Sequence, residues 1–138
     1  MYEKEKELFA EMMGIIAKLR GPEGCLWDRK QTLESLAPNI LEEAEEISQA
    51  VKNKCKDNLC EELGDLLMVI LMQIEIAREK DLFTYSDVLN GAIKKFVRRQ
   101  PYVFGDVKVN TPEEALAVWK KMKQEEKEGN NKNINSLD

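Results

Sequence analysis

Residues 61–72 read EELGDLLMVILM, and this stretch decides the fold. From Leu66 to Met72 the chain is apolar without interruption, so a helix over these residues has no polar face to present to water. Asp57 is a suitable N-terminal cap, and the helical pattern continues to about Lys80. We therefore expect a long central helix that other helices cover.

Two helices are expected before it. Residues 2–19 carry an apolar stripe at helical spacing, and a loop follows through residues 20–28. Thr32 can cap a short helical turn, and Pro38 is expected to open a longer helix that ends near Lys52, because proline suits the first helical position.

Two more helices are expected after it. One begins near Thr84 or Ser86 and ends before Pro101. The other begins at the capping-box sequence TPEE of residues 111–114 and ends near Glu128. No segment alternates like a strand, so the sequence predicts an all-α bundle of about five helices. Residues 1–128 are expected to form one domain, and the polar tail 129–138 is expected to be disordered.

Composition narrows the class of function. The 138 residues carry a formal net charge of −5, which argues against binding a nucleic acid polymer. The longest apolar run is too short to span a bilayer, and the N-terminus carries no apolar signal, so we expect a cytoplasmic protein without a membrane partner. The chain has no histidine, and its three cysteines form no CxxC pair, which disfavours a zinc site. Catalysis would have to use carboxylates, lysines or a metal.

The most informative feature is a pair of acids on each of two helices. Glu43 and Glu46 lie three residues apart on the second long helix, as do Glu62 and Asp65 on the third, so each pair shares a helix face. Glu62 and Asp65 project in line with apolar residues. Four carboxylates gathered in this way form an all-oxygen site that suits Mg²⁺, or Mn²⁺ in its place.

Acidic helix faces are also common without any metal. Glu45 and Glu61 are expected to be solvated, and the spacing of the other acids alone fits a solvated face as well as a metal site. Gly64, between Glu62 and Asp65, costs helix stability, and close helix packing is the expected reason for it.

Several segments together resemble the MazG-like nucleotide pyrophosphohydrolases. Glu43-x-x-Glu46, followed after fifteen residues by Glu62-Leu63-Gly64-Asp65, resembles the ExxE…ExxD signature of that family. Further similarity lies in LRGPEGCLWD (19–28), ILEE (40–43), RRQPYVFG (98–105) and the segment 114–121 with Trp119. The resemblance covers roughly residues 5–125.

The resemblance implies an α-helical, Mg²⁺-dependent enzyme that converts nucleoside triphosphates to the monophosphate and pyrophosphate. The metal ligands would be Glu43, Glu46, Glu62 and Asp65, and Glu42 would be the general base for the attacking water. Lys95 and Arg99 would hold the triphosphate, and Trp119 would contact the nucleotide. Gln100, Tyr102 and Leu26 depart from the family pattern, and Asn58 stands where some relatives have a lysine, which puts one phosphate contact in doubt. Lys56 is close in sequence, and whether it takes the place of that lysine is not indicated.

Alternative interpretations stay open. The cationic cluster of residues 94–99 also fits a solvated helix face, and Trp119 also fits a core position. A dUTPase-like or phosphoribosyl-ATP-specific relative and a non-catalytic bundle that binds metal or nucleotide are the rival functions. The apolar girth of residues 66–72 predicts a homodimer that completes a four-helix core, or a tetramer. The base, the sugar, the preference for canonical or noncanonical nucleotides and the number of metal ions are not indicated.

Overall fold

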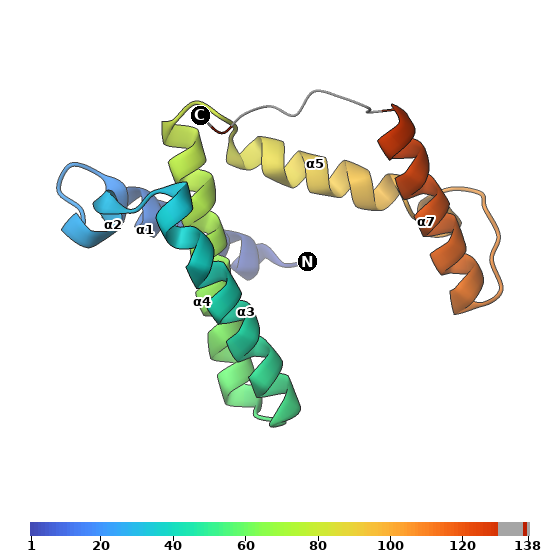
Figure 1. Ribbon diagram of the computed structural model, residues 1–138, viewed down its shortest axis with the longest axis horizontal. Helices are drawn as coiled ribbons and strands as arrows, with labels where there is room; N and C mark the ends of the chain where they lie inside the picture. The colour runs from blue at the N-terminus through green and yellow to red at the C-terminus, as the bar shows by residue number, and fades with distance from the viewer. Residues whose placement is uncertain (130–136, 138) are drawn as a thin grey trace. The chain divides into compact units, whose positions relative to one another are not determined.

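The computed structural model describes residues 1–129 and 137, and every regular element in that part of the chain is a helix, which confirms the all-α class (Figure 1). Five helices are long and two are short. The chain divides into two units, Met1–Tyr85 and Ser86–Asp138, which we describe separately. Residues 130–136 and 138 lie outside the described part, so the expected disorder of the tail stays a prediction.

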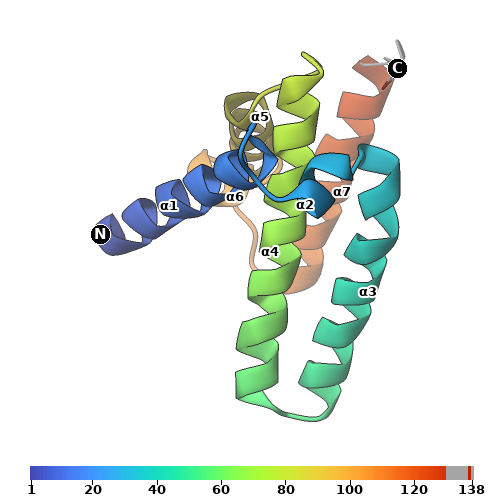
Figure 2. The same ribbon diagram turned by 90° about the vertical axis from the view of Figure 1, so that its left-hand side faces the viewer.

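The first unit is organised around a helical hairpin. Its helices are α1 (Glu3–Arg20), α2 (Leu26–Lys30), α3 (Leu33–Lys52) and α4 (Lys56–Glu79). α3 and α4 run antiparallel side by side, as Figures 1 and 2 both show, and α1 crosses α4. Among the described residues no helix is long and apolar enough to cross a membrane.

The start of α3 differs from the prediction. Pro38 lies inside the helix, and the helix begins five residues earlier at Leu33. A capping box explains the early start: Thr32 Oγ accepts from the Ser35 N–H at 3.0 Å, and Ser35 Oγ accepts from the Thr32 N–H at 2.8 Å. This reciprocal cap sets the first turn, and Pro38 is tolerated near the N-terminus.

Both long helices of the hairpin end in a Schellman motif without glycine. At the end of α3 the Cys55 N–H donates to the Ala50 carbonyl at 3.1 Å, and Lys54 takes a left-handed φ of 53°. Asp81 does the same after α4, with a φ of 56°. The prediction that Asp57 caps α4 was wrong, because the helix begins at Lys56 and Asp57 lies in its first turn.

The core of the first unit lies in the C-terminal half of α4. Its most buried positions on that helix are Leu71, Met72, Ile74, Ile76 and Ala77, joined by Ile16 of α1 and by Leu36 and Ala50 of α3. Over residues 66–70 the helix is apolar on all sides, and a single chain covers these residues only in part. Leu8 and Ile15 of α1 are about half exposed, and Val51 near the end of α3 is 56% exposed.

Arg20 connects three helices of this unit. Its guanidinium donates to the Glu79 carboxylate of α4 at 2.8 Å and to the carbonyls of Asp28 and Gln31 on either side of the end of α2. The loop before α2 folds back onto α1, where the Cys25 N–H donates to the Leu19 carbonyl at 2.8 Å. A Cβ on Gly24 would lie 2.1 Å from that carbonyl oxygen, so only glycine fits. The prediction that residues 20–28 form one loop missed the short helix α2.

A buried carboxylate lies at the end of α4. Glu75 is 4% exposed and accepts from Arg78 at 2.6 Å. Tyr85 donates its hydroxyl to the Leu71 carbonyl at 3.1 Å, and burial together with the charge of Glu75 raises the pKa of Tyr85 to about 12. These contacts hold Tyr85, the last residue of the first unit, against α4.

The second unit begins at the second residue of α5 (Tyr85–Arg98) and also contains the short α6 (Pro101–Phe104) and α7 (Pro112–Gly129). The start of α7 follows the prediction: Pro112 is its first residue, and Thr111 Oγ accepts from the Glu114 N–H at 3.1 Å. The Glu114 carboxylate accepts from the Asn110 N–H at 2.7 Å, one residue before the position expected for a capping box. The helix α6 was not predicted.

Candidate functional site

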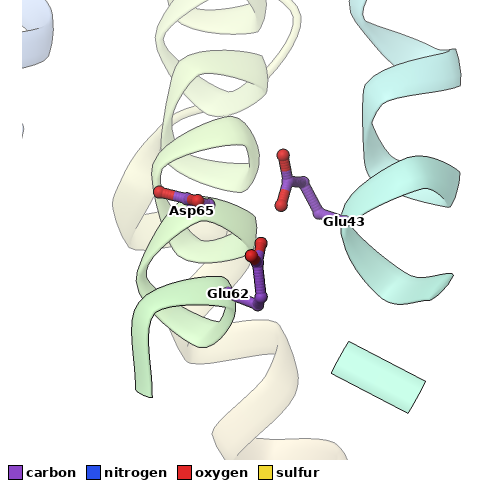
Figure 3. A group of neighbouring side chains, drawn as sticks. All are labelled: Glu43, Glu62 and Asp65. Carbon is purple, nitrogen blue, oxygen red and sulfur yellow. The ribbon is translucent and has the colours of Figure 1, made fainter. Parts of the chain in front are cut away.

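The hairpin brings acids from α3 and α4 together. Glu43 of α3 and Glu62 and Asp65 of α4 each have a carboxylate oxygen within 4.8 Å of the others. Figure 3 shows Glu43 and Glu62 extending into the space between the two helices. Helical geometry explains the arrangement, because Glu62 and Asp65 are three residues apart on one face of α4.

The fourth predicted ligand borders this cluster. Glu46 hydrogen-bonds with Glu62, and this contact is the largest reason why the pKa of Glu62 is raised to about 8; burial and a hydrogen bond with Glu43 add to it. Burial also raises the pKa of Glu43, with the charges of Glu46 and Asp65 acting in the same direction against a hydrogen bond with Glu62. Crowding with neighbouring carboxylates therefore raises the pKa of Glu43 and that of Glu62.

Two carboxylate oxygens in the cluster are buried without a hydrogen-bond partner among the described residues, Oε2 of Glu43 and Oε2 of Glu62. A buried acceptor without a partner costs free energy, and a cation would satisfy both. The donor set consists of carboxylate oxygens alone, which is the set that Mg²⁺ prefers. The residues present thus fit a divalent metal ion of the hard class.

The exposure of Asp65 differs from the sequence prediction. Asp65 was expected to point into a buried face, but its side chain is exposed, and only Glu43 and Glu62 of the cluster are partly buried. The expectation for Gly64 was also wrong, because a Cβ there would meet nothing within 4 Å. Both residues lie where α4 is uncovered by the rest of the first unit. Glu42 is exposed on α3 next to Glu43.

A cavity of about 210 Å³ adjoins the acids near the closed end of the hairpin. Glu46 and Glu62 form part of its wall. The rest includes three amide side chains, which are Gln49, Asn53 and Asn58. Asn58, the residue that departs from the family pattern, therefore lines a hollow next to the acidic cluster. Lys56 does not line this cavity, so its role stays open.

The predicted phosphate-binding and nucleotide-binding residues lie in the second unit. Lys95 is exposed on α5, while Arg99, just after that helix, is only 11% exposed. Arg99 lies over the ring of Trp119 at 5.2 Å, and Lys123 is at the same distance from that ring. Trp119 is half-buried, so its burial does not decide between a core position and contact with a nucleotide.

Sequence reasoning missed Glu126. Its carboxylate accepts from Arg98 Nε at 2.8 Å and from Arg99 Nη2 at 2.8 Å. These bonds, those of Arg99 above all, lower the pKa of Glu126 to about 2. The spacing contained a signal, because Trp119, Lys123 and Glu126 are four and then three residues apart on one face of α7.

The described helices hold a carboxylate cluster in a helical hairpin and a cationic, aromatic cluster in the second unit, which defines the class of all-α proteins with a candidate site for a divalent metal ion. The chain belongs to the MazG family within that class. Residues 31–104 match the family model described as the MazG nucleotide pyrophosphohydrolase domain, which confirms the resemblance drawn from the motifs.

Similarity to curated relatives and to a solved structure agrees with this family assignment. The chain is 45% identical over 120 residues, 87% of its length, to the nucleoside triphosphate pyrophosphohydrolase/pyrophosphatase MazG of Thermotoga maritima, and covers 46% of that protein. It is 38% identical over 117 residues, 84% of its length, to the nucleoside triphosphate pyrophosphohydrolase of Escherichia coli, and covers 44% of it.

The fold matches the crystal structure of a mazG-related protein from Thermotoga maritima with a TM-score of 0.70 and 30% identity. This match covers 83% of the chain and 98% of that structure. The chain spans less than half the length of the two curated relatives named above.

Proposed function

We propose that this chain hydrolyses nucleoside triphosphates, ribo or deoxy, between the α and β phosphates, which yields the nucleoside monophosphate and pyrophosphate. This proposal rests mainly on the acidic cluster, in which Glu43 and Glu62 each have a buried carboxylate oxygen without a hydrogen-bond partner in the described chain. Membership of the MazG family and the names of the relatives support the reaction.

Glu43, Glu46, Glu62 and Asp65 would hold Mg²⁺, with Mn²⁺ as a substitute, and one or more ions fit a set of four acids. When bound, the ion neutralises phosphate charge and lowers the pKa of a coordinated water. The protein's own share of the work is then to position the substrate and the water.

Lys95 and Arg99 are proposed to bind the phosphates, with arginine able to contact two oxygens at once. Glu42 is proposed to orient the water that attacks the α phosphorus and to accept its proton, after which the bond to the β phosphate's bridging oxygen breaks and pyrophosphate leaves. Trp119 is proposed to contact the nucleotide, with part of its ring already facing Arg99 and Lys123.

The test is pyrophosphate release from a panel of NTPs and dNTPs, with Mg²⁺ and with EDTA. Wild type is compared with Glu43→Gln and with Glu61→Gln, which removes the same charge from an exposed position on α4. We expect monophosphate and pyrophosphate only with Mg²⁺, a loss of at least about 100-fold in Glu43→Gln, and no change in Glu61→Gln. Orthophosphate as the sole product would contradict the proposal.

A non-catalytic bundle that binds metal or nucleotide is the alternative. Calorimetry separates it from the enzyme, because such a bundle would bind Mg²⁺ and triphosphate without releasing pyrophosphate from any member of the panel. The panel also measures which base and sugar are preferred, and whether noncanonical nucleotides are better substrates.

We also propose that a second copy of the chain covers the uncovered apolar face of the hairpin, as a homodimer or within a tetramer. Leu41, Val51, Leu63 and Ile70, all on α3 or α4, are 39–75% exposed in one chain. A two-fold axis beside the hairpin would bring four helices around one core, which is a common helical architecture.

A further inference from the structure

Glu126 is the acceptor for two consecutive arginines of the second unit. Its side chain is 14% exposed, against 11% for Arg99 and 49% for Arg98. Arg98 donates Nε to Oε1 at 2.8 Å. Arg99 donates Nε and Nη2 to Oε2 at 3.0 and 2.8 Å. Arg99 is therefore held in a nearly buried, charge-assisted pair that links the end of α5 to α7.

The ion pair with Glu126 uses one edge of the Arg99 guanidinium. A guanidinium has five N–H donors, and Glu126 takes the edge formed by Nε and Nη2. One Nη1 donor and the second Nη2 donor form the opposite edge, and a fork of this kind matches two phosphate oxygens. The guanidinium carbon lies over the Trp119 ring, 5.2 Å from the ring centre, which is a cation–π contact.

We infer that Glu126 is a positioning residue for triphosphate binding: it fixes the guanidinium of Arg99 so that the opposite edge is oriented toward the substrate's phosphates. The inference rests on the proposed function, in which Arg99 binds those phosphates. Glu126 does not contact the substrate itself. It acts through Arg99, as a carboxylate that orients a binding group and limits the entropy lost when the substrate binds.

The positioning role and simple electrostatics predict opposite changes in KM when Glu126 is neutralised. Glu126 is a negative charge beside cations that are proposed to bind a polyanion. If charge alone mattered, neutralising Glu126 would tighten triphosphate binding. If positioning matters, the same change weakens binding, because Arg99 loses its fixed orientation. The direction of the change in KM therefore separates the two.

The experiment compares steady-state kinetics of wild type, Glu126→Gln, Glu126→Asp and Glu125→Gln on the NTP that wild type turns over fastest. Glu125 is exposed on the same helix and loses the same charge, so it is the matched control. We expect KM to rise about tenfold in Glu126→Gln, while kcat stays within about threefold of the wild-type value. This pattern is expected when a variant loses binding energy that the substrate and the transition state share. Glu126→Asp should recover part of the loss, and Glu125→Gln should leave KM unchanged or lower it slightly.

A second readout does not depend on turnover. In ¹⁵N NMR spectra of the substrate-free protein, the Arg99 Nε–H should be protected from solvent exchange in wild type and Glu125→Gln, and exposed in Glu126→Gln. Calorimetry with an α,β-methylene triphosphate and Mg²⁺ should show weaker binding for Glu126→Gln alone. Circular dichroism checks that each variant is folded. If Glu126→Gln is unfolded, Glu126→Asp replaces it in the comparison.

The outcomes separate the inference from the proposed function. If wild type turns over triphosphates and Glu126→Gln has an unchanged or lower KM, the positioning role is wrong while the function stands. If wild type releases no pyrophosphate, the proposed function fails, and the analogue binding data alone decide the role of Glu126. If wild type does not bind the analogue either, both are overturned.

Discussion

Glu43 and Glu62 face each other across the hairpin of α3 and α4, and each has one carboxylate oxygen buried without a hydrogen-bond partner in the described chain. Two acids in this arrangement repel each other unless a proton or a cation lies between them. The folded protein keeps them close because the helices that carry them pack tightly elsewhere. This is the behaviour of a site that gives up stability for binding.

The first prediction concerns this cost. Near pH 7, Glu62→Gln should raise the melting temperature of the metal-free protein by about 3 °C. The pKa of Glu62 is raised to about 8, so folding near neutral pH makes Glu62 take up a proton, and a neutral glutamine avoids this cost. Added Mg²⁺ should raise the melting temperature of wild type, by mass action on the folded state, and leave that of Glu62→Gln nearly unchanged. Differential scanning fluorimetry with and without Mg²⁺ measures both effects.

Glu61→Gln is the control for this experiment, since Glu61 is exposed and adjacent on α4. It should keep the response to Mg²⁺ and the melting temperature of wild type. A lower melting temperature for metal-free Glu62→Gln would contradict the prediction, because it would mean that the carboxylate stabilises the fold without metal.

The second prediction concerns acid. The pKa of Glu126 is lowered to about 2 from an ordinary 4.5 by its bonds to Arg99 and Arg98. An acid with a lowered pKa binds fewer protons folded than unfolded, so its contribution to stability is complete above pH 4.5 and is lost as the pH falls toward 2. The difference in unfolding free energy between wild type and Glu126→Gln should therefore shrink over that range.

Urea unfolding at several pH values between 6 and 2.5 measures this difference. The exposed Glu125 serves again as the control, and Glu125→Gln should differ from wild type by a small amount at every pH. A difference between wild type and Glu126→Gln that stays constant down to pH 2.5 would show that the arginine pairs do not set the pKa of Glu126.

The third prediction concerns self-association. Ile70 is 39% exposed in one chain, within the apolar girth of α4. Ile70→Glu should be tolerated by the isolated chain, but it would bury charges at a two-fold interface, where unpaired charge costs several kcal/mol. Light scattering after size exclusion should give a dimer or tetramer for wild type and a smaller species for Ile70→Glu.

Leu116→Glu, at a half-exposed position of α7, is a control that keeps the hairpin intact. It should have the oligomeric state of wild type. A monomeric wild type at micromolar concentration would remove the proposed dimer, and the exposed residues of the hairpin would then need another explanation.

The sequence predicted the long helices well because their signals are local. Periodicity located the central helix, and Pro112 and Thr111 marked the start of α7 correctly. The predictions of helix ends were wrong where another local signal set the boundary. The cap formed by Thr32 and Ser35 starts α3 before Pro38. Lys54 and Asp81 end helices in a left-handed conformation for which glycine is the usual signal.

The site was predicted in part for the same reason. Motif spacing identified the acids that the hairpin brings together, since both pairs depend only on helical geometry. The spacing did not predict the exposure of Asp65, which depends on what covers α4. It did not predict the partner of Arg99 either, because Glu126 is 27 residues away and the chain must turn through α6 and a loop before the two meet.

The last prediction concerns Gly64, between Glu62 and Asp65 on α4. A Cβ at Gly64 would meet nothing within 4 Å, so alanine fits without a clash, and alanine favours a helix by about 1 kcal/mol over glycine. Gly64→Ala should therefore raise the unfolding free energy of the metal-free chain by about 0.5–1 kcal/mol in urea. Gly24→Ala is the opposite case, because its Cβ would lie 2.1 Å from the Leu19 carbonyl oxygen, and it should destabilise the protein. If Gly64→Ala is more stable yet loses activity, a bound substrate or a second copy of the chain needs the open space beside Gly64. A loss of stability in Gly64→Ala would instead mean that the surface of α4 at this position is already covered in solution.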